Sequence, residues 1–285
     1  MTTVLFWSTV ATAFKFTLRY LDVFQLLFYA CLTSVVTLAV VVAIQGKLAS
    51  LLVVFRQHWK ITLLAGGLNP GLYYLVLFEA YDRLPAQVAQ PINYTWAITL
   101  TFMSLIFLKQ KITTADITAA FVCYLGVLII ATQGDFSNFI SSDLVGLALA
   151  LFSTFIWAGY WILNIRDPRD PVTGMFLNFS VALIIIGMLC FLFSGFTIPL
   201  VGFAGAVYVG LFEMSLAFLC WSAALRLTSN TSRISNLIFL SPFLSLIFIN
   251  RILGETIYTT TYLGLVIIVC GLLFQQWSHT RFRQN

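Results

Sequence analysis

The sequence predicts an all-α polytopic membrane protein whose ten transmembrane helices form two inverted repeats of five helices each. Of its 285 residues, 60% are hydrophobic and 9% are charged, whereas an ordinary soluble domain carries roughly 25% charged residues. Ten segments reach the length of about 17 to 25 mainly apolar residues that can cross a bilayer. Two of them, within 83–111 and 226–255, resemble each other. Lipid must therefore solvate most of the chain, and the chain looks duplicated.

Most connections between the predicted spans are short, so neighbouring helices should run antiparallel. The spans cover residues 4–20, 24–44, 61–81, 86–108, 114–132, 144–165, 172–193, 200–224, 229–250 and 258–277. The connection 45–60 is longer and predicts a short interfacial helix, because its apolar residues share one face and basic residues surround them. These residues are Leu48, Leu51, Leu52 and Phe55, with Lys47, Arg56 and Lys60.

Corresponding positions recur in the two halves of the chain. When the two similar segments are aligned, Asn93 falls on Asn236 at an offset of 143 residues. Trp7 in the first span falls on Trp157 in the sixth at an offset of 150 residues, and differences in loop length account for the change. A polar position and a tryptophan are thus repeated inside the membrane.

The predicted repeats are residues 1–135, with the interfacial segment 45–60, and residues 136–285, which end in a short basic tail. Because five crossings is an odd number, the two halves enter the membrane from opposite sides. Inverted repeats of this kind recur in secondary transporters, where the substrate binds near the midplane between them.

The basic residues predict the orientation of the chain. With a cytoplasmic N-terminus, eleven of the fifteen Lys and Arg residues lie on the inner side, three lie outside, and Lys15 lies within the first span. The first apolar run has no basic residue before it, so we interpret it as a retained span and not as a signal peptide. We expect a multi-pass protein of the plasma membrane, the inner membrane in a bacterium, with both termini cytoplasmic. The inner set is Lys47, Arg56, Lys60, Lys109, Lys111, Arg166, Arg169, Arg226, Arg233, Arg281 and Arg283, and the outer set is Arg19, Arg83 and Arg251.

The motifs argue against catalysis. The chain has no G-x-S-x-G, H-E-x-x-H or phosphate-binding glycine loop, and its two histidines, His58 and His279, fall in polar connections. The five cysteines are scattered through apolar segments, so we expect no metal site and no cofactor. Basic residues stand singly between spans, which does not make the basic face that nucleic acid requires.

Glu213, in the middle of the eighth span, is the costliest residue to bury in lipid, at about 2.5 to 3.5 kcal/mol on insertion scales. It must face protein or water. We interpret it as a contact for a substrate amine or as a site of proton coupling. The alternative is a structural carboxyl group bonded to a neighbouring helix.

Lys15 lies near the outer end of the first span. It is a candidate for substrate contact, but its long stem could also snorkel to the interface or pair with Asp22, Glu79 or Glu213. Glu79 lies close to the predicted outer surface, which favours a hydrated residue at the mouth.

A cluster in the fourth span predicts the cavity wall. Asn93 must find partners at membrane depth, and Tyr94 and Trp96 offer flat faces suited to an amphiphilic solute. Gln90 lies one turn before them, and Asn236 shares the argument by its repeat position. Further candidates are Trp7, Trp157 and Tyr160, for which helix packing or an interfacial aromatic belt is an alternative.

The third span contains A-G-G-L-N-P-G, with Gly67, Asn69 and Pro70 at its centre. Proline removes a backbone hydrogen bond, and broken helices mark binding sites in transporters, so this segment is a candidate hinge. By the offset of 143 residues, Pro70 corresponds to Glu213. Close helix packing through small residues is the alternative.

Three stretches carry a resemblance to a known family: L-F-W-S-T-V-A-T-A-F-K at Leu5–Lys15, I-N-Y-T-W-A at Ile92–Ala97, and L-S-P-F-L-S-L-I-F-I-N-R-I-L-G-E at Leu240–Glu255. The sequence resembles the drug/metabolite transporter superfamily, in its ten-helix, two-repeat EamA type, over nearly the whole chain. N-Y-x-W is similar to the aromatic-amino-acid exporter branch, in which proline usually follows where this chain has Ala97. The resemblance implies export and a central cavity walled by spans 1, 3, 4, 6, 8 and 9, with spans 5 and 10 peripheral.

Together these features predict a secondary transporter that exports small amphiphilic metabolites, such as amino acids or related zwitterionic or cationic solutes, by alternating access. Phosphorylated cargo is disfavoured because it calls for several basic groups in the pocket, and Lys15 alone is present there. The expected partners are the small-molecule substrate and the lipid bilayer, with proton coupling as a hypothesis and a monomer or homodimer as the assembly. A passive channel is the alternative function, followed by a membrane scaffold or enzyme.

Overall fold

The computed structural model describes residues 2–109, 112–133, 143–221 and 240–282, and within these ranges the chain is helical with no strand. In the first half the helices are α1 (Thr2–Thr17), α2 (Val23–Ile44), α3 (Leu51–Gly66), α4 (Tyr73–Arg83), α5 (Ala86–Tyr94), α6 (Trp96–Leu108) and α7 (Thr114–Thr132). In the second half they are α9 (Leu144–Ile165), α10 (Pro171–Phe193), α11 (Leu200–Tyr208), α14 (Ser241–Phe248) and α15 (Thr259–Phe282). Short irregular helices join some of them: η1 (Leu48–Ser50), η2 (Gly67–Leu72), η3 (Val209–Ala217) and η5 (Ile249–Leu253).

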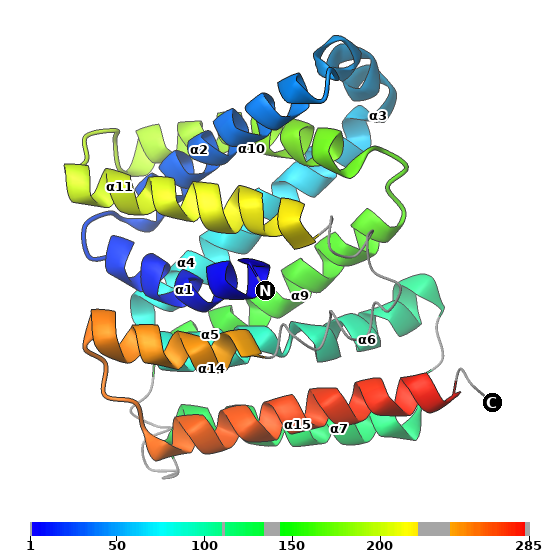
Figure 1. The fold of residues 1–285 in the computed structure, drawn as a ribbon, viewed down its shortest axis with the longest axis vertical. Coiled ribbons are helices and arrows are strands. Elements are labelled where there is room, and N and C mark those ends of the chain that lie inside the picture. The colour runs from blue at the N-terminus through cyan, green and yellow to red at the C-terminus, as the bar shows by residue number, and fades with distance from the viewer. Residues whose placement is uncertain (1, 110–111, 134–142, 222–239, 283–285) are drawn as a thin grey trace.

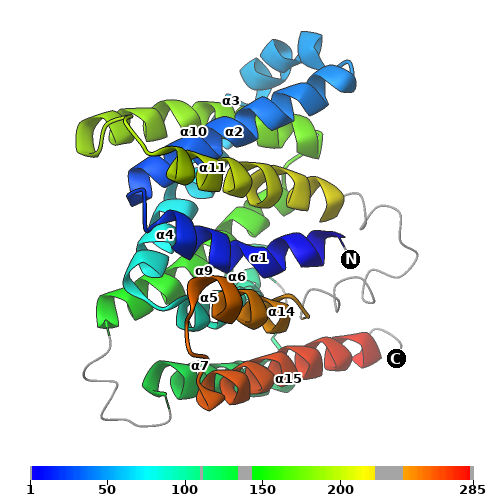
Figure 2. The same cartoon turned by 60° about the vertical axis from the view of Figure 1, so that its left-hand side comes forward.

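The predicted fold class is confirmed. Within the described ranges eight helices are long and apolar enough to cross a membrane, and Ser241–Leu253 forms a shorter apolar helix. Helices α1, α11, α14 and α15 run in similar directions while α4 and α9 are inclined to them, and α2 lies beside α10 at one edge and α7 beside α15 at the other (Figures 1 and 2). The second span thus pairs with the seventh and the fifth with the tenth, which is the pairing that two related halves produce. Helix α1 begins, and α15 ends, at the same side of the bundle (Figure 2).

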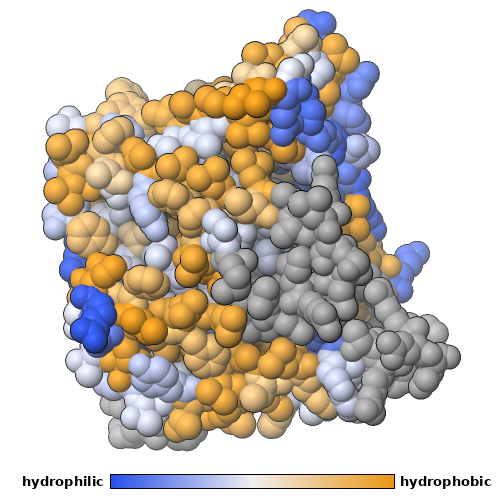
Figure 3. Space-filling model, in the orientation of Figure 1, coloured by the Kyte–Doolittle hydropathy of each residue, from blue (hydrophilic) through white to orange (hydrophobic). Residues whose placement is uncertain are grey.

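The surface explains why this bundle needs lipid. Figure 3 shows a surface that is mostly hydrophobic, with hydrophilic residues gathered where α2 leads into α3. Large apolar side chains such as Phe121, Phe191 and Leu200 are 69 to 80% exposed. In water these side chains would favour aggregation, whereas in a bilayer they face a solvent of matching polarity.

Capping residues set where several helices begin. Asp22 accepts hydrogen bonds from the backbone N–H groups of Phe24 and Gln25 and forms a capping box at the start of α2. Thr113 and Asp116 form a second capping box at the start of α7. Such caps satisfy N–H groups that a helix leaves unpaired in its first turn. They place the helix starts close to the predicted span boundaries.

The third span differs most from its predicted boundaries. Instead of starting near residue 61, α3 begins at Leu51 and continues the predicted interfacial segment, with a non-helical backbone at His58. Leu48, Leu52 and Val53 are more than half exposed beside the basic residues of this segment. The non-helical backbone at His58 is a kink that divides α3 into an interfacial part, residues 51–57, and the start of the membrane span, close to the predicted boundary at residue 61.

Glycines allow the closest helix packing at the α7–α15 edge. A Cβ atom added to Gly126 would lie 2.6 Å from the carbonyl oxygen of Gly264, and the reverse distance is the same. The two backbones therefore meet where neither residue has a side chain, as small residues permit in membrane helix pairs.

A buried arginine fixes the α9–α10 connection. Arg169 donates to the carboxylate of Asp167 at 2.6 Å, to the Thr62 hydroxyl at 2.7 Å and to Oδ1 of Asn178 at 3.0 Å. Asp167 and Asn178 belong to the second half and Thr62 to α3, so this guanidinium joins the two halves of the chain. Lys47 and Asp170 form a further ion pair between the halves at 3.0 Å.

Candidate functional site

The helices of the third and eighth spans are irregular at corresponding depths. In η2, between α3 and α4, Asn69 has φ −142° and ψ 118°, which is extended and not helical, and Pro70 follows it. Pro70 has no N–H, so the regular ladder cannot continue through it. In η3, after α11, the backbone forms a π-helical turn that contains Glu213. Widened turns of this type often occur at functional sites.

A hydrogen bond connects these two irregular segments. Tyr74, one residue into α4 after the break, donates its hydroxyl to Oε1 of Glu213 at 3.1 Å, and both groups are buried. Oε2 of Glu213 and both polar atoms of the Asn69 side chain are buried with no hydrogen-bond partner among the described residues. An unpaired buried polar group destabilises a fold by about 1 to 3 kcal/mol. The centre of the bundle therefore holds polar groups whose bonding capacity is not used in this conformation.

A cavity of about 420 Å³ lies beside Glu213, large enough for a small organic molecule. It is bounded by α1, α4, α5, α6, α9, η3 and its continuation, and α15. The described lining residues are Trp7, Val10, Phe14, Tyr73, Leu77, Tyr81, Gln90, Asn93, Tyr94, Trp96, Ala97, Leu100, Thr101, Trp157, Trp161, Glu213, Phe218, Trp221, Leu272, Gln275 and Gln276. Among these residues, Glu213 alone can carry a charge at neutral pH.

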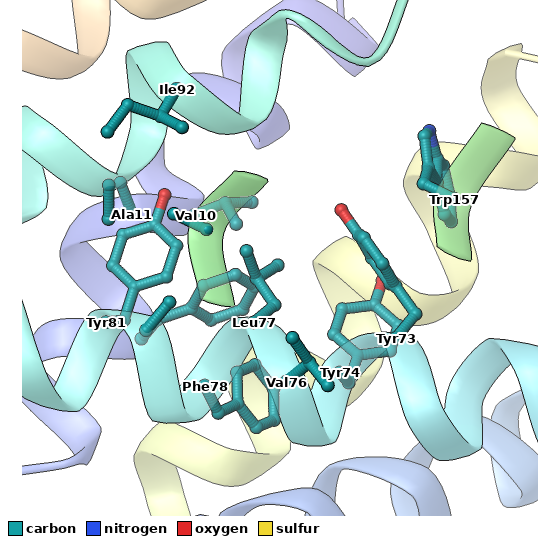
Figure 4. Close-up of a cluster of buried hydrophobic side chains, with 14 of the residues drawn as sticks. Val10, Ala11, Tyr73, Tyr74, Val76, Leu77, Phe78, Tyr81, Ile92 and Trp157 are labelled. Carbon is teal, nitrogen blue, oxygen red and sulfur yellow. The ribbon is translucent and has the colours of Figure 1, made fainter. Parts of the chain in front are cut away.

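Aromatic rings form most of the cavity wall. Tyr73 stacks on Trp157 with ring centroids 4.5 Å apart and planes 27° apart, and Figure 4 shows Tyr73 on α4 extending toward Trp157 on α9. Trp96 and Trp161 are nearly parallel at 6.4 Å and 17°. The ring centroids of Trp7 and Trp221 are 5.4 Å apart. Flat faces of this kind bind apolar or aromatic bodies and attract cations through their π electrons.

The polar cluster predicted in the fourth span lies on the cavity and is held from several helices. Asn93 donates to the hydroxyl of Ser153 at 2.9 Å and accepts from the hydroxyl of Tyr73 at 3.4 Å. Tyr94 donates to the Ser241 hydroxyl in α14 at 3.0 Å. Oε1 of Gln90 is buried without a hydrogen-bond partner among the described residues. The fourth span is thus fixed in rotation so that this face looks into the cavity.

Lys15 is the sequence candidate that the structure places elsewhere. Its Nζ donates to the backbone carbonyls of Tyr81 at 2.7 Å and Asp82 at 2.9 Å, at the end of α4, and its side chain borders a second, smaller pocket. Carbonyl groups at a helix C-terminus carry partial negative charge and attract an ammonium group, so the long stem extends toward the loops and away from the cavity. The snorkelling interpretation fits this geometry.

The remaining candidates occupy distinct places. Tyr160 is buried behind Trp157, at 5.7 Å between ring centroids, and does not belong to the described lining. Gly67 and Pro70 lie in the irregular turn, while a Cβ at the neighbouring Gly66 would collide with the backbone carbonyl of Asn178. The helix break at Asn69 and the close helix packing at Gly66, which were alternative interpretations of this segment, thus both occur, at neighbouring positions. Asn236 lies outside the described residues.

Several lining residues were missed by the sequence analysis. Tyr73, Leu77 and Tyr81 recur every four residues on α4, and this spacing was an available signal for one helix face. Gln275 and Gln276 come from the tenth span, which the family resemblance implied to be peripheral. Gln275 reaches the wall because it donates to the Thr101 hydroxyl at 2.9 Å and to Asp116 at 2.8 Å. The described residues contain no group of three His, Cys, Asp or Glu side chains that could hold a metal ion.

The chain belongs to the EamA-like transporter family, whose pattern it matches over residues 1–132 and 144–275. It is therefore a multi-pass membrane protein of a transporter family, and this family and the transporter-named relatives point to transport and not to catalysis. The predicted resemblance to the EamA type is confirmed. The narrower aromatic-amino-acid exporter branch is not confirmed by these comparisons.

Individual relatives are distant but cover most of the chain. An "Uncharacterized transporter" of Archaeoglobus fulgidus is 25% identical over 278 residues, which is 95% of this chain and 94% of that protein. A "Probable terminal-alkyne amino-acid exporter" of Streptantibioticus cattleyicolor is 23% identical over 215 residues, covering 74% of this chain and 70% of that protein. One crystal structure with 18% sequence identity superposes with a TM-score of 0.69, covering 99% of this chain and 96% of the other, and shares its fold.

Proposed function

We propose that this protein is a secondary transporter that exports small amphiphilic amines, including amino acids, by alternating access around the central cavity. The observation that carries the proposal is the cavity itself, which combines aromatic walls with one ionisable carboxyl group, Glu213, among the described lining residues. Such a site fits a solute with an apolar or aromatic body and a positively charged end.

The charge of the lining supports an amine-bearing substrate over a phosphorylated one. A phosphate group is usually held by several Arg or Lys side chains, and Lys15 is directed at backbone carbonyls outside the cavity. Amide groups of Gln90 and Asn93, both on α5, can bond a carboxylate or hydroxyl group of the solute. The named amino-acid exporter among the relatives agrees with this class of substrate.

The arrangement of the helices supports alternating access. The third and eighth spans are both irregular near the cavity, and a break in a helix allows its two halves to tilt separately. Glu213 couples to the third span through Tyr74, so a proton or a cationic substrate at Glu213 would act on both irregular segments. With both termini on the cytoplasmic side of a plasma membrane, cargo would leave toward the opposite face.

The experiment is flux through purified protein in liposomes, with radiolabelled tryptophan and tryptamine as probes. These probes share an aromatic body and an ammonium group and differ in the carboxylate. We expect saturable uptake that is accelerated by unlabelled probe on the other side of the membrane, which only a carrier produces. Unsaturable flux without this acceleration would instead identify a channel, and absence of flux for both probes would refute the substrate class.

A further inference from the structure

The loops between α14 and α15 close one side of the bundle through an interaction with the start of α5. Helix α5 begins after Pro85 and has no side-chain cap of its own. The carboxylate of Glu255 accepts hydrogen bonds from the backbone N–H of Ala86 at 3.0 Å and of Gln87 at 3.3 Å. A carboxylate at a helix N-terminus forms charge-assisted bonds and also opposes the helix dipole. The cap of a first-half helix is therefore supplied by the second half of the chain.

The side chain of Gln87 completes this contact from the other direction. Its Nε2 donates to the backbone carbonyl of Thr256 at 2.9 Å. Its Oε1 accepts from the backbone N–H of Tyr258 at 3.1 Å and from the hydroxyl of Thr261 at 3.0 Å. The side chain is 2% exposed. Five hydrogen bonds thus join the start of α5 to residues 255–261, and we name this set the Gln87–Glu255 latch.

We propose that the Gln87–Glu255 latch is the gate that closes the outer side of the transporter, and that it must open once in each transport cycle. The proposal rests on the alternating access put forward above. The latch joins the start of α5 to the segment that follows the ninth span, and alternating access requires the contacts that close one side of the bundle to separate while those on the other side form. Breaking it frees groups that water can solvate at the loops, so opening is reversible.

The interior next to the latch is closed in the same conformation. Phe14 on α1 packs edge-on against Phe78 at 4.8 Å and Tyr81 at 5.4 Å on α4, between the cavity and the latch side of the bundle. Phe14 and Tyr81 border the cavity there, whereas its described lining extends in the other direction to Trp221 and Gln276. A solute in the cavity can therefore reach the latch side only after α1 and α4 separate at these rings.

The two halves of the chain differ at the position of Glu255, and this difference gives the latch its direction. The fourth and ninth spans both end in a left-handed residue, Lys109 with φ 55° and Gly254 with φ 72°. At the offset of 143 residues that aligns these spans, Glu255 falls on Ile112 in the first half, which has no charge. A contact made by this aligned position could not include charge-assisted bonds. The latch side is therefore closed more stably than an equivalent contact could close the other.

Hydrogen–deuterium exchange of the full-length protein in lipid nanodiscs, followed by mass spectrometry, tests the gate without any substrate. The variants are Glu255→Gln and Gln87→Ala. Thr256→Ala is the matched control because Gln87 bonds the backbone carbonyl of Thr256 and not its side chain. We expect exchange in the first turn of α5 to rise about tenfold or more in both variants, the factor that corresponds to about 1.4 kcal/mol.

The readout that separates a gate from a local helix cap is exchange at a distance. Opening the latch side would also raise exchange at residues 13–17 of α1 and 78–82 of α4, which surround the rings described above, and the control would leave both regions unchanged. A rise confined to residues 86–89, or equal rises in Thr256→Ala, would overturn the proposal. If liposome flux fails while this exchange pattern appears, the transport proposal falls and the gate stands as a conformational switch.

Discussion

Replacing Glu213 with glutamine isolates the charge of the cavity, because the two side chains have nearly the same shape. Tyr74 can still donate to the carbonyl oxygen that remains, so the hydrogen bond of 3.1 Å has an acceptor in the variant. What disappears is the negative charge beside the rings of Trp7, Trp157 and Phe218. We therefore expect Glu213→Gln to weaken binding of a cationic probe while the protein stays folded.

The structure bounds the size of this effect. A hydrogen bond to a charged group contributes about 1.5 to 3 kcal/mol and one to a neutral group about 0.5 to 1.5 kcal/mol. The difference of about 1 to 1.5 kcal/mol sets a lower limit of about fivefold in affinity. Direct attraction of two charges about 4 Å apart at an effective dielectric constant of about 20 reaches about 4 kcal/mol, which sets an upper limit of several hundredfold.

Binding can be followed by isothermal titration calorimetry of the purified protein, because indole-containing probes would themselves fluoresce with the tryptophans of the cavity wall. Tryptamine carries a positive charge, and tryptophol, with a hydroxyl group in place of the amine, is its neutral analogue. Glu213→Gln should weaken the binding of tryptamine by a factor between the two limits above, and it should change the affinity for tryptophol by less than about twofold. The control is Glu79→Gln, which makes the same chemical change at the surface, where Glu79 pairs with Arg83 at 2.7 Å. This variant should alter the affinity for neither probe. Equal losses for both probes, or no loss for tryptamine, would show that Glu213 is structural.

Further predictions concern the cavity wall, the helix packing and the buried arginine. Trp96→Ala removes one of two parallel rings, so it should weaken binding of bulky aromatic amines more than binding of methylamine in the same calorimetric titration, and an equal effect on both would indicate a folding defect. Gly264→Val forces a side chain against the carbonyl of Gly126. We expect this overpacking to lower the free energy of unfolding by about 1 to 3 kcal/mol, and with it the midpoint of thermal unfolding. Gly67→Val, where a Cβ meets open space, should lower the midpoint less. Burial raises the pKa of Asp167, but hydrogen bonds from Arg169 outweigh it and hold this pKa below its usual value. A carboxyl group whose pKa is lowered by folding stabilises the fold at pH values above its pKa in the unfolded chain, and this stabilisation is lost as pH falls through its pKa in the folded protein. The thermal stability of Asp167→Asn should therefore drop less in acid than that of the wild type.

The sequence was sufficient to predict the fold because a membrane imposes simple rules on length and polarity. The predicted spans 114–132 and 144–165 agree with α7 and α9 residue for residue, since polar caps and turns border each apolar run. In the third span the sequence predicted an interfacial helix within 45–60 and a hinge at Asn69 and Pro70, and the backbone leaves helical geometry at Asn69. It did not predict the kink at His58, where neither proline nor glycine marks the break.

The site was predicted where polarity marks it and missed where it does not. Glu213, Asn93 and Gln90 stand out in an apolar chain, and all three border the cavity. Trp161 and Trp221 do so as well, but in a chain that is 16% aromatic nothing in the sequence separates a cavity ring from a lipid-facing one. Lys15 was assigned to the cavity because a charge at depth suggests function. The carbonyl groups that bind the Lys15 ammonium group come from residues 81 and 82, and no sequence pattern predicts this contact.

Inverted repeats give a transporter two related conformations, so any preference between them must come from side chains that the repeats do not share. This chain has two such differences. At the cavity, the proline of the third span corresponds by repeat position to the carboxyl group of the eighth, so the hinge lies in one half and the charge in the other. At the loops, Glu255 corresponds to Ile112, so only one of the two aligned positions carries a charge. A cation bound at Glu213 would compete for the carboxylate oxygen that accepts the hydrogen bond from Tyr74. Tyr74 lies on α4, the same helix as Phe78 and Tyr81, which pack next to the latch. Cargo charge and gate closure are thus connected through α4, and removing the charge of Glu255 should weaken closure on the latch side.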